Sequence, residues 1–355
     1  MGDLKHNISG IFCSILMICM LIFGMICIVI RYQQTNQTDP GEIVSYTFCQ
    51  PLNFIVAFLT IVLNVSGNRT KIVALITRLS VINGLLDNYS RLQSTKSRNL
   101  NFNKMALVMI TGIIIPFLLY DSFNYGRNYS HVLSILLRFS HFLNVVIMLQ
   151  FCKFVKIIQN SLTKLINIMK TYDINTQRIG ELKKMWNKTR KIQVSDIVTL
   201  RRLYNDIFET VQLLNHVYGC PILLEFLRQT IGLTVNFYYM IKYFYNLEEY
   251  TFIQPYFLIS KLLWLAMFLS MILCTTVFCH LGMLESRKLS SQIQKNLLQF
   301  PMDKEIIYQL QLFSGQVSEN KINFTAFWFL QIDISLLCTA LATAVTYIVI
   351  LIQLK

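Results

Sequence analysis

Seven apolar segments constrain the fold of this chain more than any other feature of its sequence. A helix needs about 20 mostly apolar residues to cross the hydrocarbon core of a bilayer. Charged residues make up only 14% of the chain, against roughly 25% in an average soluble protein. We therefore predict an all-helical, polytopic membrane protein in which residues 1–355 form a single membrane domain. The predicted spans are 11–30, 43–65, 105–120, 131–152, 219–245, 256–284 and 325–353.

The first of these segments leaves an alternative open. It follows a short region with Lys5 and His6, as the apolar part of a secretory signal peptide does. Its apolar run is about twice as long as that of a signal peptide, and no small-x-small cleavage site is clear. We interpret residues 11–30 as a spanning helix, and six spans remain if this segment is cleaved.

The distribution of basic residues predicts how the protein is oriented. With a cytoplasmic N-terminus, 25 of the 32 Lys and Arg fall in inner segments, while only Arg31, Arg127 and Lys355 lie outside. This is the positive-inside bias of membrane proteins. It predicts an extracellular C-terminus, and it accounts for the net charge of +14 without a nucleic-acid partner.

The inner segments 153–218 and 285–324 are predicted to be cytoplasmic anchor segments, as helical extensions of spans 4, 5 and 6. Apolar residues recur every three or four positions, which is typical of an amphipathic helix. These faces need a partner, and three candidates remain open: each other, in a self-contained hairpin, the 285–324 segment, or a neighbouring subunit. The patterns are Phe154, Ile158, Leu162, Leu165, Met169 and Tyr172 after span 4, and Val194, Ile197, Tyr204, Ile207, Val211 and Leu214 before span 5.

The sequence contains none of the motifs that would indicate an enzyme. It has no Gly-rich phosphate loop, no His-Glu-x-x-His and no nucleophile elbow. Cys279 and His280 are adjacent, which is not the spacing of zinc ligands. We therefore expect no catalytic residues, no metal site and no cofactor.

The last apolar segment carries a thin polar stripe. Gln331, Ser335, Thr339, Thr343, Thr346, Ile350 and Gln353 follow one another at gaps of three or four residues, with Ile350 as the one apolar member. This spacing places them on one face of a helix. Such a face either packs against another helix or lines water. Helices around an axis that turn it inward would form a pore lined with hydroxyl groups and narrowed at Ile350 and Gln353.

Asp333 lies near the inner end of the same segment. An acidic residue at membrane depth is a functional candidate by default, and at the inner mouth of a pore it would concentrate cations. The alternative is a structural role, in a salt bridge or as a charge at the N-terminus of the helix.

The end of the chain resembles the signature of insect gustatory receptors. Thr346, Tyr347, five hydrophobic residues and Gln353 match the family's Thr-Tyr, hydrophobic stretch and Gln-Phe. The approach to the last span, with Phe324, Thr325 and Ala326 followed by Asp333, is also similar. The specific match covers about the last 35 residues, and the predicted topology extends the likeness to the whole chain.

This resemblance implies a ligand-gated, non-selective cation channel. Four subunits, identical or related, would be joined by a cytoplasmic anchor around a pore lined by the last helix. Tyr347 would be a packing residue of the motif. The chain has Leu354 where the family usually has Phe, beside the expected extracellular gate, and this departure puts gate closure and ion selectivity in doubt.

The resemblance also implies a ligand cavity that opens toward the outer leaflet, so the candidates are polar and aromatic residues at the outer ends of spans. Aromatic rings offer stacking faces, and buried cations favour anionic or carbonyl-rich ligands. Few acids appear there, which favours a bitter or other nonsugar tastant. The alternative is an aromatic belt with snorkelling lysines. The candidates are Tyr120, His131, Arg138, His141, Tyr239, Lys242, Tyr243, Tyr256, Lys261 and Trp264.

We expect a receptor channel at the plasma membrane of sensory neurons, and two other classes of membrane protein remain as alternatives. A seven-helix G-protein-coupled receptor needs the opposite orientation, which the distribution of basic residues opposes. It also usually has an intracellular tail, whereas only two residues follow the last predicted span here. A transporter should show substrate uptake without ligand-gated current. The partners expected of the channel are membrane lipid, a small-molecule tastant and related receptor subunits.

Overall fold

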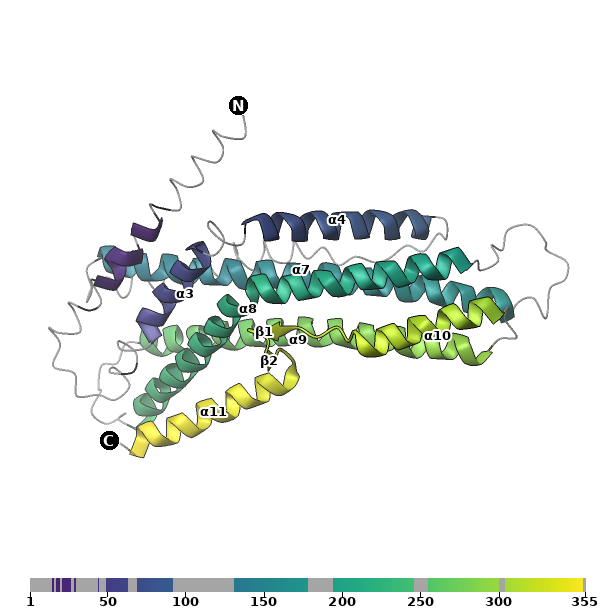
Figure 1. Cartoon of the computed structure of the whole chain (residues 1–355). Helices are drawn as coiled ribbons and strands as arrows, with labels where there is room; N and C mark the ends of the chain where they lie inside the picture. The colour runs from purple at the N-terminus through teal and green to yellow at the C-terminus, as the bar shows by residue number, and fades with distance from the viewer. Residues whose placement is uncertain are drawn as a thin grey trace, which may run out of the picture.

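A computed structural model of the chain describes residues 49–62, 69–91, 131–177, 194–245, 255–299 and 304–353, with scattered positions between 15 and 44. In this part the fold is helical apart from one small hairpin (Figure 1). The helices are α3 (Gln50–Val62), α4 (Arg69–Arg91), α7 (His131–Gln177), α8 (Val194–Tyr245), α9 (Pro255–Gln299), α10 (Lys304–Glu319) and α11 (Ile334–Gln353); the strands are β1 (Thr325–Ala326) and β2 (Leu330–Gln331).

Three helices are much longer than a bilayer is thick. α7, α8 and α9 contain 47, 52 and 45 residues, whereas about 20 suffice to cross the hydrocarbon core. α8 changes direction along its length, as Figure 1 shows, and Pro221 lies inside it. Proline lacks the amide hydrogen that continues the helical ladder, so it bends a helix at that point. Because α7, α8 and α9 are longer than a membrane span, each continues beyond its apolar part as a helical extension, as predicted for spans 4, 5 and 6.

We call the part built from these extensions and α10 the extension bundle. Its core is made of the amphipathic faces predicted from the sequence: Leu162 and Leu165 of α7 and Ile197 and Tyr204 of α8 are buried. α9 contributes Leu289 and Ile293, and α10 contributes Leu310, Phe313 and Val317. Within the described part of one chain, the faces of α7 and α8 therefore pack on each other and on the 285–324 segment. The side chain of Tyr172 lies outside the described residues.

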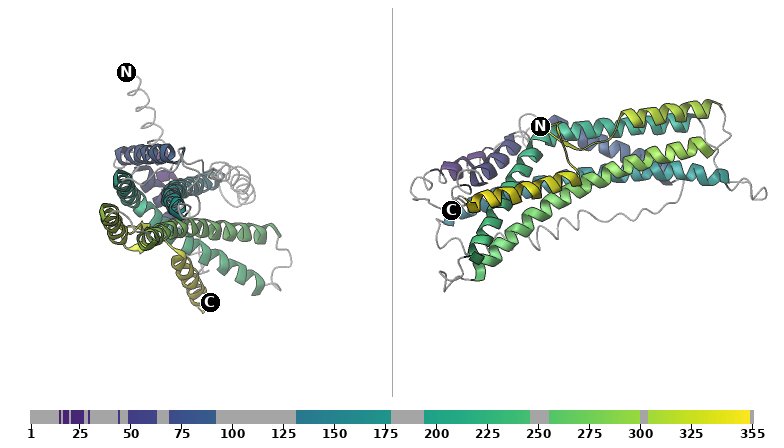
Figure 2. Two further views of the ribbon diagram at one scale, coloured as in Figure 1. Left: turned by 90° about the vertical axis from the view of Figure 1, so that its right-hand side faces the viewer. Right: turned by 90° about the horizontal axis from the view of Figure 1, so that it is seen from below.

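α4 lies along one side of the bundle, opposite α11 (Figures 1 and 2). Its apolar stripe of Leu75, Leu79, Ile82 and Leu86 is buried, at the helical spacing of three and four residues. Ion pairs link its polar flanks to the long helices: Lys164 to Asp87 at 2.6 Å and Arg78 to Glu209 at 3.1 Å.

The hairpin of β1 and β2 connects α10 to α11. Thr325 pairs with Gln331 and Ala326 with Leu330. A helical span from residue 325 was predicted, but α11 begins only at Ile334, so Gln331 lies on a strand and not on the polar stripe. The hairpin packs closely on α8 at Gly219, where an added Cβ would lie 2.8 Å from the backbone N of Phe327.

Among the described residues, three helices are long and apolar enough to cross a membrane: Arg138–Lys170, Leu258–Leu298 and Ile334–Gln353. They overlap the predicted spans 4, 6 and 7. α3 covers part of the second predicted span. The fifth lies in α8, where Glu225, Arg228 and Lys242 interrupt the apolar run. The first span is described only at scattered positions, and all of the third lies outside the described residues.

Candidate functional site

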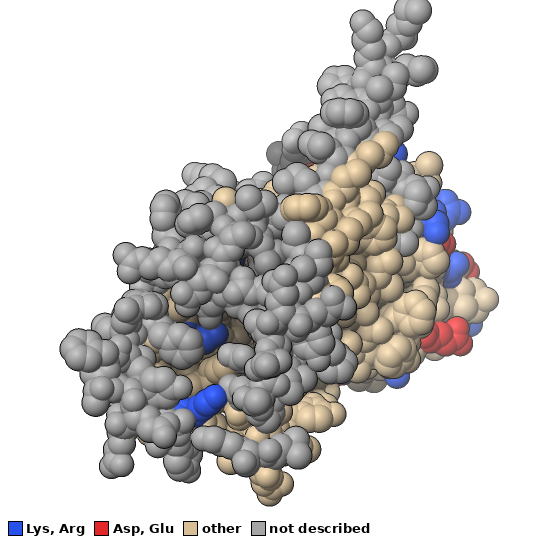
Figure 3. Space-filling view, turned by 90° about the vertical axis from the view of Figure 1, so that its left-hand side faces the viewer, with Lys and Arg blue, Asp and Glu red and all other residues tan. Residues whose placement is uncertain are grey.

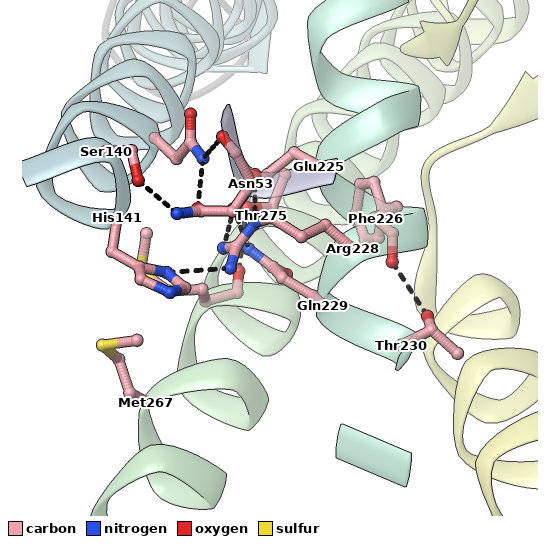
Figure 4. Close-up of polar contacts among 12 residues, drawn as sticks. Asn53, Ser140, His141, Glu225, Phe226, Arg228, Gln229, Thr230, Met267 and Thr275 are labelled. Atoms are coloured by element: carbon pink, nitrogen blue, oxygen red, sulfur yellow. Dashed lines mark hydrogen bonds and ion pairs between the residues drawn. The ribbon is translucent and has the colours of Figure 1, made fainter. Parts of the chain in front are cut away.

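Polar side chains from three helices meet in a buried cluster within the part of the chain predicted to span the membrane (Figure 4). Positions one helical turn apart share a face, so α7 and α8 can each turn three polar groups toward the same interior. We call these seven residues the buried polar cluster, and all are at most 9% exposed. They are Asn53 of α3, Ser140, His141 and Asn144 of α7, and Glu225, Arg228 and Gln229 of α8.

An ion pair lies at the centre of the cluster. Arg228 donates from Nε to Glu225 Oε2 at 2.8 Å and from Nη2 to Oε1 at 2.5 Å. Gln229 Nε2 donates to the same Oε1 at 3.0 Å. A buried charge is tolerated when it is paired and hydrogen-bonded, and the two-point geometry of a guanidinium and a carboxylate meets that requirement.

The cluster also ties α3 to α7. Asn53 Nδ2 donates to Ser140 Oγ, and Asn144 Nδ2 donates to Asn53 O at 3.1 Å and Oδ1 at 2.8 Å. Amide hydrogen bonds of this kind join membrane helices that have no hydrophobic driving force between them. The second predicted span is thereby attached to the fourth through polar side chains.

His141 connects the ion pair to aromatic rings of α9. Its Nδ1 lies 3.1 Å from Arg228 Nη1, and because a guanidinium only donates, Nδ1 accepts and the ring carries its proton on Nε2. The imidazole lies 4.7 Å from the Trp264 ring, centroid to centroid. The Arg228 guanidinium lies 5.3 Å from the centroid of Phe268, within reach of a cation–π contact.

The predicted ligand residues separate into two described groups. In the first, Arg138 lies 4.9 Å from the centroid of the Trp264 ring, so it joins His141 around that ring. In the second, Lys261 Nζ lies 4.6 Å from the Tyr239 ring. Lys242 and Tyr243 are half-buried near the end of α8. Tyr120 and the side chains of His131 and Tyr256 lie outside the described residues.

Figure 3 views the end of the molecule from which these candidates come. Lys or Arg side chains, drawn in blue, are visible there. The basic candidates on the described helices are Arg138, Lys242 and Lys261. Cations beside aromatic rings, as in these two groups, would suit a ligand with carbonyl or anionic groups.

The polar stripe of α11 lies away from the rest of the chain. The helix packs on α8 and α9 through Ala340, Ala344, Ile348 and Leu351, its buried residues. Ser335, Thr339, Thr346, Ile350 and Gln353 are exposed, and Thr343 is half-buried. With 3.6 residues per turn, the stripe and the packed face are roughly 140° apart around the helix. Among the described residues, the stripe is therefore not a packing seam.

Threonine hydroxyl groups of the stripe bond to carbonyls of their own helix. Thr339 Oγ1 donates to Ser335 O at 3.0 Å, Thr343 to Thr339 O at 2.8 Å, and Thr346 to Ala342 O at 3.0 Å. Each hydroxyl hydrogen is thus turned inward, which leaves the oxygen lone pairs facing outward. Tyr347 is exposed, and Leu354 lies outside the described residues.

Asp333 caps the N-terminus of α11. Its Oδ1 accepts from the Leu336 amide at 3.2 Å and from the Ser335 hydroxyl at 2.5 Å. This is the geometry of an N-cap, which satisfies an otherwise unbonded amide. Slight burial raises the pKa of the carboxyl group, but these hydrogen bonds, the Ser335 amide and nearby His280 lower it by more, so the pKa lies below its ordinary value.

Of the buried polar cluster, the sequence singled out His141 alone as a site candidate, and it did not indicate Asn53, Ser140, Asn144, Glu225, Arg228 and Gln229. One signal was present. Glu225 and Arg228 stand three residues apart inside a predicted span, where an ion pair on one helix face is the arrangement expected of two opposite charges. Asn53, Ser140 and Asn144 gave no such signal, because their partners lie on other helices.

The comparisons with known proteins agree with this architecture. A family model described as 7tm Chemosensory receptor matches residues 4–355, and no curated protein matches the chain. Two solved structures of the insect olfactory receptor OR5 from Machilis hrabei are similar, with TM-scores of 0.59 and, in complex with eugenol, 0.56. Both are 12% identical, and each match covers 96% of this chain and 88% of that one. The chain belongs to the 7tm chemosensory receptor family, whose members are receptors and not enzymes.

Proposed function

We propose that this protein is a gustatory receptor that acts as a ligand-gated, non-selective cation channel. The observation that carries the proposal is the polar stripe of α11, which lies on the exposed side of a 20-residue apolar helix. From Ser335 to Gln353 the stripe rises about 27 Å, close to the thickness of the hydrocarbon core. Outward-facing hydroxyl oxygens suit partly hydrated cations.

The proposed assembly is a tetramer, homomeric or heteromeric, with the stripes of four α11 helices around a central pore. The chain would have seven spans, a cytoplasmic N-terminus and an extracellular C-terminus in the plasma membrane of sensory neurons. The extension bundle would then be the cytoplasmic anchor. Its basic residues support that orientation through the positive-inside bias.

Ile350 and Gln353 would narrow the pore near its outer end, with Leu354 at the gate. An apolar ring can close a pore by excluding water. Leucine is smaller than the phenylalanine of the resembled signature, so we expect closure by Leu354 to be less complete. Asp333 would stand at the inner mouth, where a carboxylate attracts cations in addition to capping the helix.

The ligand would be a small nonsugar tastant, such as a bitter compound, that binds among the outer ends of the spans. The eugenol complex of the similar olfactory receptor supports a small-molecule ligand. Arg138, His141 and Trp264 would form one wall, and Lys261 with Tyr239 another. These cations favour compounds with carbonyl or carboxylate groups.

The direct test is current recorded from cells that express the chain alone or with related receptors, while a panel of tastants is applied. We expect cation current that a nonsugar compound opens and that persists when G-protein signalling is blocked. Current that disappears with that block, together with an N-terminal epitope accessible from outside, would instead indicate a G-protein-coupled receptor. Substrate uptake without current would indicate a transporter.

A further inference from the structure

Three consecutive aromatic residues form the exposed tip of the hairpin. Phe327, Trp328 and Phe329 are 55%, 56% and 72% exposed. The rings of Phe327 and Phe329 are nearly perpendicular, with centroids 6.5 Å apart. Single exposed apolar residues are normal on any protein, but three together mark a surface that binds something apolar. We call them the aromatic tip.

The aromatic tip stands on a firmly held base. Asn215 of α8 donates to Asn323 O at 2.9 Å and accepts from the Thr325 amide at 3.2 Å. Phe324 is fully buried against Gly282 of α9, where an added Cβ would lie 2.8 Å from its ring. Because the base is fixed to both long helices, the tip presents its rings in a set position.

The backbone of the tip is strained. Phe327 and Trp328 have φ angles of 50° and 70°, in the left-handed region that glycine enters freely and bulky residues avoid. Glycine or asparagine at these positions would form the turn more easily. The chain instead carries two large rings there, which points to a use for the rings outside the hairpin.

A lysine lies beside the aromatic tip, across one histidine. The ring of Trp328 lies 6.3 Å from that of His216 on α8, centroid to centroid. The ammonium group of Lys71 on α4 lies 2.7 Å from Nε2 of the same histidine. An ammonium group only donates, so this contact uses one of its three hydrogens and leaves the positive charge on the lysine. Among the described residues, no carboxylate pairs with Lys71.

The predicted topology places this group at the inner surface of the membrane. Lys71 follows the second predicted span, which ends at residue 65, and His216 precedes the fifth, which begins at residue 219. Trp328 precedes α11, which begins at Ile334, and Figure 1 shows the hairpin where α11 leaves the extension bundle. Tryptophan gathers at this depth in membrane proteins, and the cytoplasmic leaflet carries the anionic lipids.

We infer that the aromatic tip and Lys71 bind an anionic phospholipid of the inner leaflet. The three rings would lie at the boundary between headgroups and acyl chains, while the ammonium group of Lys71 contacts the phosphate or another anionic group of the lipid. The inference rests on the orientation given under the proposed function, since anionic lipid is a feature of the cytoplasmic leaflet. It does not need the channel activity.

A lipid at this position would have a mechanical consequence. The hairpin joins α10 of the extension bundle to α11. A bound headgroup would therefore hold the base of α11 at the membrane surface. The lipid composition of the inner leaflet could then bias how that helix is placed.

The test uses a photoreactive residue, p-benzoylphenylalanine, in place of Phe329 in the full chain. The chain is reconstituted in an equal mixture of phosphatidylcholine and phosphatidylserine, and its adducts are identified by mass spectrometry after illumination. We expect phospholipid adducts in which phosphatidylserine exceeds phosphatidylcholine about fivefold, the preference that one basic group gives. The matched control carries the same residue in place of Val81, which is 56% exposed further along α4, and should give few lipid adducts.

Three results would overturn the inference. Adducts of two 41.4 kDa chains in place of lipid would assign the tip to a protein contact. Lipid adducts in the proportions of the mixture would show an aromatic anchor without a headgroup site. Loss of the preference when inorganic phosphate is added would indicate a site for a soluble anion.

Two variants separate the lipid site from folding. Lys71→Gln should bring the two lipids to equal adduct yields at the Phe329 position, while Arg78→Gln, a basic residue further along the same helix, should keep the preference. Trp328→Gly removes the central ring and relieves its φ angle, so the chain should fold and retain less phosphatidylserine than the parent in native mass spectrometry from detergent. Retention equal to that of the parent in both Lys71→Gln and Trp328→Gly would contradict the site.

Ligand-gated current from the unaltered chain is recorded alongside, so that the two proposals can fail separately. Current without any headgroup preference would exclude the lipid site alone. A headgroup preference that depends on Lys71, in a chain without current, would support the lipid site and count against the channel.

Discussion

Arg228 holds Glu225 through two hydrogen bonds on the same face of α8, and their side chains are only 1% and 3% exposed. Because both side chains are buried, removing either the guanidinium or the carboxylate would leave the remaining charge without solvation. His141, Gln229 and Phe268 complete the surroundings of the guanidinium and carboxylate. The pair therefore makes the positions of α7, α8 and α9 depend on one another.

Glu225→Ala should destabilise the folded protein by about 3–5 kcal/mol, because it leaves Arg228 buried without its counter-charge. The measurement is thermal unfolding of the purified receptor in detergent. Arg78→Ala is the control, since its pair with Glu209 is about half exposed and such pairs contribute about 1 kcal/mol or less. Equal losses in the two variants would contradict this account of the cluster.

Gly219→Ala should displace the hairpin from α8. The new Cβ would lie 2.8 Å from the backbone N of Phe327, a contact that the rigid strand end cannot relieve by rotating a side chain. We expect lower thermal stability and, in a channel, altered opening of the pore that the hairpin leads into. Gly84→Ala on α4 is the matched control: nothing lies within 4 Å, and alanine in a helix should add about 0.5–1 kcal/mol.

Asp333 allows its capping role and its proposed role at the inner mouth to be separated. Asp333→Ala should cost about 1 kcal/mol of stability through loss of the N-cap, whereas Asp333→Asn keeps a side-chain acceptor there. If the charge attracts cations, Asp333→Asn should still lower inward cation current at low ionic strength. Currents equal to those of the parent would leave Asp333 with the capping role alone.

The same residue gives a pH dependence. Its pKa in the folded protein lies below the ordinary value of 3.8, so its ionised form stabilises the fold at pH values above about 3.8. This contribution should fall away as the pH drops through the folded pKa. In unfolding measurements, the stability difference between the parent and Asp333→Asn should therefore shrink below about pH 4, and a difference that grows there would contradict the assignment.

The helical fold and the extension bundle follow from the periodicity of the sequence. Residues such as Ile158, Leu162 and Ile207 recur at helical spacing and are buried where the pattern predicts. Local pattern could not predict the hairpin, because Phe327 and Trp328 adopt φ angles that sequence rules assign to glycine. Tertiary contacts with Asn215, Gly219 and Gly282 override that preference.

The candidate sites were predictable to different degrees. The stripe of α11 is a property of one helix, so its spacing alone fixes which residues share a face. The buried polar cluster depends on which helices are neighbours, and the sequence does not reveal that Asn53 meets Ser140 and Asn144 across 87 and 91 positions. Arg138, His141 and Trp264 are candidates because of their chemistry alone. Arg138 and His141 meet at the Trp264 ring because of how α7 and α9 pack, which the sequence does not reveal.

Leu354→Phe should change the behaviour of the proposed gate. A larger and stiffer apolar side chain closes a narrow pore more completely, so we expect lower current in the absence of ligand or altered relative permeability to cations of different size. Whole-cell recordings of the parent and the variant at matched expression measure both. Identical leak and permeability would remove this position from the gate.

The central claim is that the polar stripe of α11 faces water in an open pore. Its most direct test is a cysteine scan of residues 335–353 in a background where the exposed Cys338 is replaced by Ala, with a charged thiol reagent applied during ligand-evoked current. We predict block at Ser335, Thr339, Thr346 and Ile350, and little effect at Val345, which is 61% exposed but off the stripe, or at buried Ala344. Block that is no stronger at the stripe than at Val345 would contradict the claim.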